Sequence, residues 1–111
     1  MRKCLLIGVL LLAGGCGKAP EEKIFKLFQE GRSQVDRYEF DAAAATFRKI
    51  GEIDPSTPLG FYGSGLILER QLQYYDALRV YMSITDDASS FAPAYAGEWR
   101  ILTHLEEWTT P

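Results

Sequence analysis

Apolar side chains recur along the chain in five segments, which are separated by short polar breaks rich in turn-forming residues. The breaks include "IDPSTP" at residues 53–58 and "DDASSFAP" at residues 86–93, and prolines with short polar residues end helices. No segment alternates apolar and polar residues as a half-buried strand does. The pattern therefore predicts five helices, over residues 20–35, 40–52, 58–71, 74–85 and 92–107.

Two of the helix starts carry a specific signal. Pro20 precedes Glu21 and Glu22, and a proline in the first turn followed by carboxylates suits the positive end of the helix dipole. Thr57 and Pro58 form a cap and a first-turn proline for the third helix.

The segment "FDAAAATF" at residues 40–47 has a counterpart further along the chain, "YYDALRVY" at residues 74–81. Consecutive alanines favour a helix but bury little surface each, so the large residues beside them must fill space next to a close helix contact. The 34-residue period of these segments predicts a structural repeat. The positions that keep the register are Leu27 with Phe61, Gly31 with Gly65, Phe40 with Tyr74, Ala43 with Ala77, Phe47 with Tyr81 and Ile50 with Ile84.

Helix pairs with this period resemble the tetratricopeptide repeat (TPR) family, whose pattern is a large residue, Leu-Gly, Tyr, Ala-x-x-x-Phe and Pro. The chain departs from that pattern at Glu30, Gln34, Ser64 and Ser89. The matching residues are Leu27, Gly31, Ala43, Phe47 and Pro55 in the first unit, residues 24–57, and Phe61, Gly65, Leu68, Ala77 and Tyr81 in the second unit, residues 58–91.

The resemblance implies an all-α fold: a short TPR-like α-solenoid of two helix-pair repeats plus a C-terminal capping helix over residues 92–108, within a domain of residues 23–108. Gly31 and Ala43 would then let two antiparallel helices approach each other. Phe40 and Phe47 would fill the space beside that contact. The alternative is a plain helical bundle in which the 34-residue spacing is a coincidence.

Length and charge narrow the class of protein. The chain has 111 residues, which is enough for one small domain. Its formal net charge is −3 and it has no basic run, so it is not expected to bind nucleic acid.

The first sixteen residues, "MRKCLLIGVLLLAGGC", have the pattern of an export signal. Arg2 and Lys3 precede an apolar run from Leu5 to Ala13, which suits a signal sequence and is shorter than the roughly 20 residues of a membrane span. Small residues follow directly before Cys16.

The stretch "LAGGC" resembles the lipobox of bacterial lipoproteins, in which the cysteine becomes the N-terminus and carries acyl chains. It implies a signal peptide at residues 1–15, and a lipidated Cys16 with a tether at residues 16–22. Ala13 stands where the family usually has a large aliphatic residue. Gly17, rather than aspartate, favours the outer membrane if the cell is Gram-negative. The alternative is an ordinary cleaved signal with an incidental cysteine.

Candidate catalytic and metal-binding residues are few. Cys4 lies in the predicted signal and Cys16 carries the lipid, so the mature chain offers no thiol for a disulfide or a metal site. Asp86 and Asp87 lie in a break, where carboxylates usually cap helices. His104 is the only histidine, and no phosphate loop or nucleophile elbow is present. The sequence therefore predicts no enzyme activity, no metal and no cofactor besides the covalent lipid on Cys16.

Two functions fit these features. The first is a membrane-anchored interaction module, an adaptor that attaches a protein partner or assembly to the membrane of the bacterial cell envelope. The alternative is an accessory lipoprotein subunit of an envelope machine for secretion, pilus or outer-membrane assembly, without peptide binding of its own.

In the TPR family the first helices of successive units line a concave groove, which implies a partner-binding surface here. The Lys/Asn clamp that some members use for a C-terminal carboxylate is missing, because Phe28 and Arg32 stand in its place. An apolar or aromatic partner segment with some acidic character suits the lining better. Alternatively, Phe25 and Phe28 belong partly to the core. The residues expected in the groove are Phe25, Phe28, Arg32, Val35, Tyr62, Leu66, Glu69, Arg70, Arg100 and His104.

The fifth helix suggests a second binding surface. Tyr95, Trp99 and Leu102 follow one another at helical spacing on the face that, in each earlier unit, packs on the unit's own second helix. We expect a partner helix, or a second copy of the chain forming a homodimer, to dock there. The alternative is that Trp99 folds down and closes the core.

Overall fold

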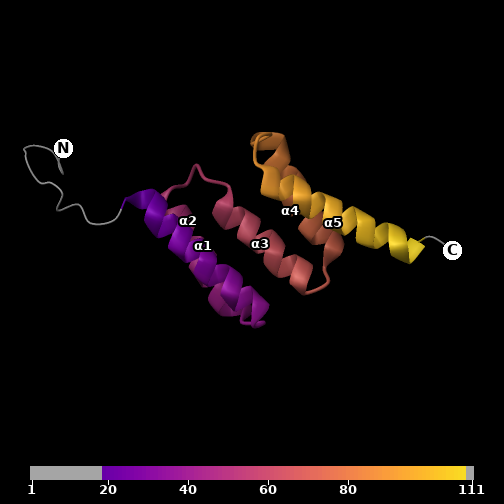
Figure 1. Cartoon of the computed structure of the whole chain (residues 1–111), viewed down its shortest axis with the longest axis horizontal. Coiled ribbons are helices and arrows are strands. Elements are labelled where there is room, and N and C mark those ends of the chain that lie inside the picture. Colours follow the sequence, from indigo (N-terminus) through magenta and orange to yellow (C-terminus); the bar gives the residue numbers. More distant parts are fainter. Residues whose placement is uncertain (1–18, 110–111) are drawn as a thin grey trace, which may run out of the picture.

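The computed structural model describes residues 19–109, in which the chain forms five helices and no strand. Each helix packs against the next, and α1 also contacts α3. Figure 1 shows α1 and α2 at the N-terminal side of the molecule, α3 in the middle, and α4 and α5 at the C-terminal side. The predicted fold class, a short all-α solenoid of two helix pairs and a terminal helix, is confirmed. The helices are α1 (Pro20–Asp36), α2 (Phe40–Ile53), α3 (Leu59–Arg70), α4 (Tyr74–Asp87) and α5 (Ala92–Thr109).

The helix boundaries lie within two residues of the predicted ones. The helix α1 begins at Pro20, inside the segment predicted as a tether. The helix α3 begins at Leu59 with Pro58 at its N-cap, so the expected placement of Thr57 as the cap and Pro58 in the first turn is one residue too early. The Leu59 N–H still donates to Thr57 Oγ1 at 3.4 Å. The predicted signal peptide and Cys16 lie outside the described residues. Among the described helices, none is both long and apolar enough to span a membrane.

Two equivalent turns reverse the chain within the helix pairs. Tyr38 and Leu72, which occupy the same position of the 34-residue register, have positive φ values of 62° and 65°. After Tyr38, the Glu39 N–H donates to the Gln34 carbonyl at 2.8 Å, and the second turn repeats this bond at 2.9 Å. This is the Schellman arrangement, which satisfies the last carbonyls of a helix. The repeat therefore extends to the backbone of the turns, although neither left-handed position is a glycine.

An aromatic ring from the second helix of each pair lies between two glycines of neighbouring helices. A Cβ atom added at any of these glycines would lie between 2.3 and 2.6 Å from a ring atom, which is closer than any side chain tolerates. Glycine is therefore required for the helices to approach the ring. The predicted role of the first glycine in each pair is confirmed, and the second glycine was not anticipated. The pairs are Gly31 and Gly63 around Phe47, and Gly65 and Gly97 around Tyr81.

Two hydrophobic cores form, one around Phe47 and the other around Tyr81. Ala43 and Ala77 are fully buried, as expected at close helix contacts. Phe28 of α1 contacts both cores, and the centroid of its ring lies 5.9 Å from those of Phe47 and Tyr62. The two units are thus joined by aromatic packing into one continuous stack.

Candidate functional site

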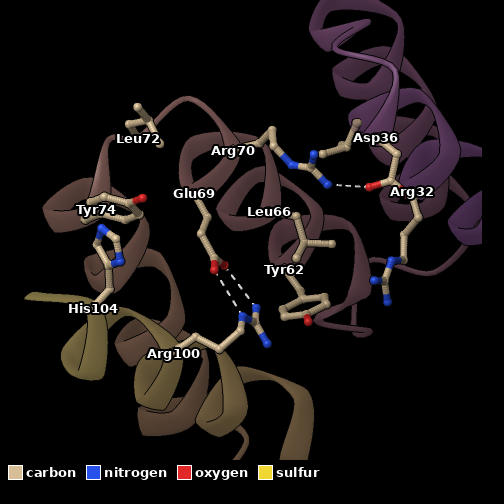
Figure 2. A pocket seen from close by; sticks show the side chains of 11 residues that line it. Arg32, Asp36, Tyr62, Leu66, Glu69, Arg70, Leu72, Tyr74, Arg100 and His104 are labelled. Carbon is tan, nitrogen blue, oxygen red and sulfur yellow. Dashed lines mark hydrogen bonds and ion pairs between the residues drawn. The ribbon is translucent and has the colours of Figure 1, made fainter. Parts of the chain in front are cut away.

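A hollow of about 580 Å³, hereafter the groove, lies where α1, α3 and α5 face one another. Figure 2 shows α1 on one side of it, α3 in the centre and α5 on the other side. The lining is a mixture of cations, carboxylates, aromatic rings and aliphatic side chains. The lining residues are Arg32, Val35, Asp36, Tyr62, Leu66, Glu69, Arg70, Leu72, Tyr74, Arg100 and His104.

The 34-residue register places equivalent side chains together in the groove. Arg32, Leu66 and Arg100 come from the same position of α1, α3 and α5, and all three line it as predicted. One helical turn further on, Asp36, Arg70 and His104 form a second row.

Glu69 of α3 is the most strongly bonded carboxylate of the groove. Arg100 donates to it twice, from Nε at 3.0 Å and from Nη2 at 2.9 Å (Figure 2). From the core side, the Tyr81 hydroxyl donates to Glu69 Oε1 at 2.9 Å. Glu69 therefore links α3, α4 and α5, and bidentate pairs of this kind fix geometry as well as contribute energy.

The same contacts shift two pKa values. Burial, followed by the nearby Glu69 charge, raises the pKa of Tyr81 above its usual range, because ionisation would place a second anion beside Glu69 inside the core. The hydrogen bonds to Glu69 raise the pKa of Arg100 despite its partial burial. Both groups therefore keep their protons throughout the physiological pH range.

The second carboxylate of the groove is paired as well. Asp36 of α1 accepts a hydrogen bond from Arg70 of α3 at 2.5 Å, as Figure 2 shows. The guanidinium of Arg70 also lies over the Tyr38 ring, 5.5 Å from its centroid. This pair is half-exposed, so its contribution to stability is small, but it positions Arg70 beside α1.

Arg32 is the cation of the groove that remains available. Its guanidinium lies 6.0 Å from the centroid of the Phe28 ring. Among the described residues it has neither a hydrogen bond nor an ion pair. Because Asp36 and Glu69 each already hold another arginine, Arg32 contributes an unneutralised positive charge next to Leu66 and Tyr62.

His104 lies at the α5 end of the groove. Its ring centroid is 4.7 Å from that of Tyr74, which Figure 2 shows directly beside it. Its Nδ1 atom is 4.0 Å from Glu107 Oε1. These neighbours are typical of a histidine that packs at a helix surface.

Two of the residues predicted for the groove lie elsewhere. Phe28 is half-buried between the two cores, so the core alternative holds for it. Phe25 is exposed and does not line the groove. It shares a helix face with Arg32 but lies seven residues earlier, about 10 Å along the helix axis, whereas the groove opens beside the C-terminal halves of α1 and α3.

Three lining residues were missed by the sequence analysis: Asp36, Leu72 and Tyr74. Asp36 could have been found, because it is the counterpart of Arg70 in the same 34-residue register that places Arg32 and Leu66 together. Leu72 and Tyr74 belong to the turn after α3 and the first turn of α4, where helical periodicity gives no indication of side-chain direction.

The α5 residues Tyr95, Trp99 and Leu102, hereafter the terminal stripe, lie at the surface. Trp99 is 73% exposed, so it does not fold down to close the core, contrary to the alternative considered from the sequence. It stands at the position that Gly31 and Gly65 occupy in α1 and α3.

The described residues contain no group of three or more His, Cys, Asp or Glu side chains placed to hold a metal ion. No protein-family model matches the chain, and neither a curated protein nor a solved structure matches it. The geometry of the groove and of the terminal stripe is therefore the basis for a functional assignment.

Proposed function

We propose that the protein is a lipid-anchored interaction module of the bacterial cell envelope, an adaptor that attaches a protein partner to the membrane. The groove carries this proposal, because it combines apolar side chains with an unneutralised arginine in one row across both repeats. The lipobox-like "LAGGC" before residue 17 supports the membrane anchor, and the 34-residue helix pairs support membership of the TPR family.

The lining defines the chemistry of the partner. Leu66, Leu72 and the ring of Tyr74 offer apolar contacts, and Arg32 offers a charge to an acceptor. The other two arginines are held by Glu69 and Asp36, so they shape the groove rather than bind a ligand. A peptide segment with an apolar or aromatic side chain and a carboxylate one turn away matches this arrangement.

The test uses the full-length protein purified in mild detergent and two fluorescent synthetic peptides. One combines leucine, phenylalanine and glutamate, and the other has lysine in place of glutamate. We expect fluorescence anisotropy to show binding of the acidic peptide only. Because hydrogen bonds to charged groups contribute about 1.5–3 kcal/mol, Arg32→Glu should weaken binding at least about tenfold.

Lys49→Glu is the matched control, since it makes the same charge change at an exposed position of α2 outside the groove. Equal losses in the two variants would mean that the peptide responds only to net charge. Equal binding of both peptides to the unaltered protein would contradict the acidic partner.

A second candidate function is an accessory subunit held permanently in an envelope machine. The exposed terminal stripe favours it, because large uncovered apolar surfaces usually mark interfaces. Purification from detergent-solubilised membranes distinguishes the two. A stoichiometric complex that persists in every growth condition, with no peptide binding by the isolated protein, would favour the subunit.

A further inference from the structure

A second hollow, of about 350 Å³, lies between α2 and α3 and shares no lining residue with the groove. We name it the outer hollow. Phe61 and the edges of the buried Phe47 and Ile67 side chains form apolar walls, and the small residues Ala44 and Gly51 leave space beside α2. At Gly60 the two helices approach closely, because a Cβ atom there would lie 2.8 Å from the Phe47 carbonyl oxygen. A Cβ atom added at Gly51 would contact nothing within 4 Å, so there is room above this residue.

The internal repeat shows that the outer hollow is particular to the first unit. Gly51 and Ser64 correspond, one repeat later, to Thr85 and Glu98. In the second unit these two residues cross the gap between α4 and α5 with a hydrogen bond from Thr85 Oγ1 to Glu98 Oε2 of 2.7 Å. Ala44 likewise corresponds to a half-buried leucine that packs on the second core. The first unit has only small side chains at these positions.

The terminal stripe also departs from the repeat, but here a larger side chain replaces a smaller one. Where α1 and α3 carry Gly31 and Gly65, α5 carries the projecting side chain of Trp99. The corresponding surfaces of α1 and α3 are covered by α2 and α4, whereas within the described residues no helix covers this surface of α5. The molecule thus has one surface with a projecting aromatic ring and another with an apolar recess.

We propose that the two surfaces bind each other between copies of the chain: Trp99 of one copy inserts into the outer hollow of the next. An engineered apolar cavity of about 150 Å³ holds benzene, so the outer hollow has room for an indole ring. The half-exposed ring of Phe61 offers an aromatic contact of the kind that tryptophan makes at the centre of interfaces.

Charge complementarity also favours a second copy as the occupant. Arg48 lines the outer hollow, and within the described part of the chain it has no hydrogen bond or ion pair. On α5, Glu106 lies seven residues after Trp99, on the same helix face. The two surfaces therefore carry opposite formal charges, which favours a contact between copies of the chain.

The contact joins two different surfaces, so it is heterologous: in a pair, one copy keeps its outer hollow free and the other keeps its Trp99 free. It therefore produces rings or chains rather than a closed symmetric dimer. The inference rests neither on the groove nor on the lipid anchor, and its failure would leave both proposals standing.

The first measurement is the mass distribution of the full-length protein in detergent, by analytical ultracentrifugation over a range of concentrations. We expect concentration-dependent oligomers in the unaltered protein. Trp99→Ala removes the inserted ring and should weaken association about 30-fold or more. Gly51→Leu places a side chain in the outer hollow, where a Cβ atom meets nothing within 4 Å, and should have the same effect. Leucine is the better helix former, so Gly51→Leu should not impair folding, and circular dichroism checks this.

Mixing the two variants gives the decisive result. The Trp99→Ala copy still has an open outer hollow, and the Gly51→Leu copy still has its tryptophan. Each alone should be monomeric, whereas their mixture should form a heterodimer and nothing larger. Tyr75→Ala, at an exposed position outside both surfaces, is the control and should associate like the unaltered protein.

Three outcomes would overturn the proposal. The first is a protein that stays monomeric at all concentrations. The second is undiminished association of Gly51→Leu together with loss in Trp99→Ala, which would indicate α5 packing on α5. The third is the absence of a heterodimer in the mixture.

Discussion

At the residue scale, single side chains contribute to both the hydrophobic core and the groove. The ring of Tyr81 packs between Gly65 and Gly97, and its hydroxyl donates a hydrogen bond to Glu69 from the core side. Glu69 in turn holds Arg100 on the groove side. The core and the candidate binding surface are therefore only one side chain apart, so a change in the core is expected to alter the groove.

The raised pKa of Tyr81 makes a pH-dependent prediction. In the unfolded chain the phenol ionises near its usual pKa of about 10, whereas in the folded protein it stays protonated to higher pH. The unfolded state therefore releases a proton above pH about 10 that the folded state keeps. The free energy of unfolding should be undiminished below pH 10 and fall by about 1.4 kcal/mol per pH unit above it from this group alone.

Tyr81→Phe should remove that slope. Urea unfolding curves between pH 8 and 11, for the full chain in detergent, measure it. The variant should also lose about 1.5–3 kcal/mol at pH 8, because it lacks the hydrogen bond to the charged Glu69. Tyr75→Phe is the control, since Tyr75 is exposed and should leave the curve unchanged. Parallel pH slopes for Tyr81→Phe and the unaltered protein would contradict the burial argument.

At the element scale, the helices and their order were predictable from sequence. The contacts between an aromatic ring and two glycines that join the helices were predictable only in part. Prolines, short polar residues and the 34-residue register mark where helices end, because those signals are local. The glycines on the second side of each aromatic ring, Gly63 and Gly97, were missed. Their role depends on which helix of the next unit approaches the ring, which is a property of tertiary packing.

The close helix contact at Ala77 gives a prediction at this scale. Ala77 is fully buried in α4, where the second core packs around it. A larger side chain should overpack the contact, so Ala77→Leu should lower the free energy of unfolding by about 1–3 kcal/mol. Ala42→Leu is a matched control, because Ala42 lies on the exposed side of α2. Urea unfolding followed by circular dichroism compares them, and equal changes in both variants would mean that Ala77 is not tightly packed.

At the scale of the whole molecule, the two units have equivalent backbones but different surfaces. The groove was largely predictable, because Arg32, Leu66 and Arg100 follow the repeat. The outer hollow was not predictable, because it arises where the first unit has Gly51 and Ser64 instead of a pair that closes the gap. Such a space becomes visible only when the two units are compared in three dimensions. The position of Phe25 was wrong for a related reason, since the spacing gave its helix face but not how far along the helix the groove extends.

The proposed anchor would bring the domain close to the membrane. The helix α1 begins at Pro20, four residues after Cys16. A chain of that length spans at most about 14 Å when fully extended. If Cys16 carries acyl chains, the N-terminal end of α1 is held next to the lipid surface. The adjacent α2–α3 turn would then lie near the membrane, because α2 runs antiparallel to α1.

The anchor itself gives the last prediction. Stable anchoring by acylation takes two chains or a second membrane signal. The lipobox resemblance implies more than one acyl chain on Cys16, so the proposed lipid should decide where the domain resides. Cys16→Ala should abolish incorporation of a clickable fatty-acid analogue and move the protein out of the washed membrane fraction, or leave it unprocessed with residues 1–15 attached. Cys4→Ala should change neither result, because this cysteine lies in the proposed signal peptide. If Cys16→Ala were labelled as strongly as the unaltered protein, the lipoprotein assignment would be wrong, while the helical repeat and its groove would remain.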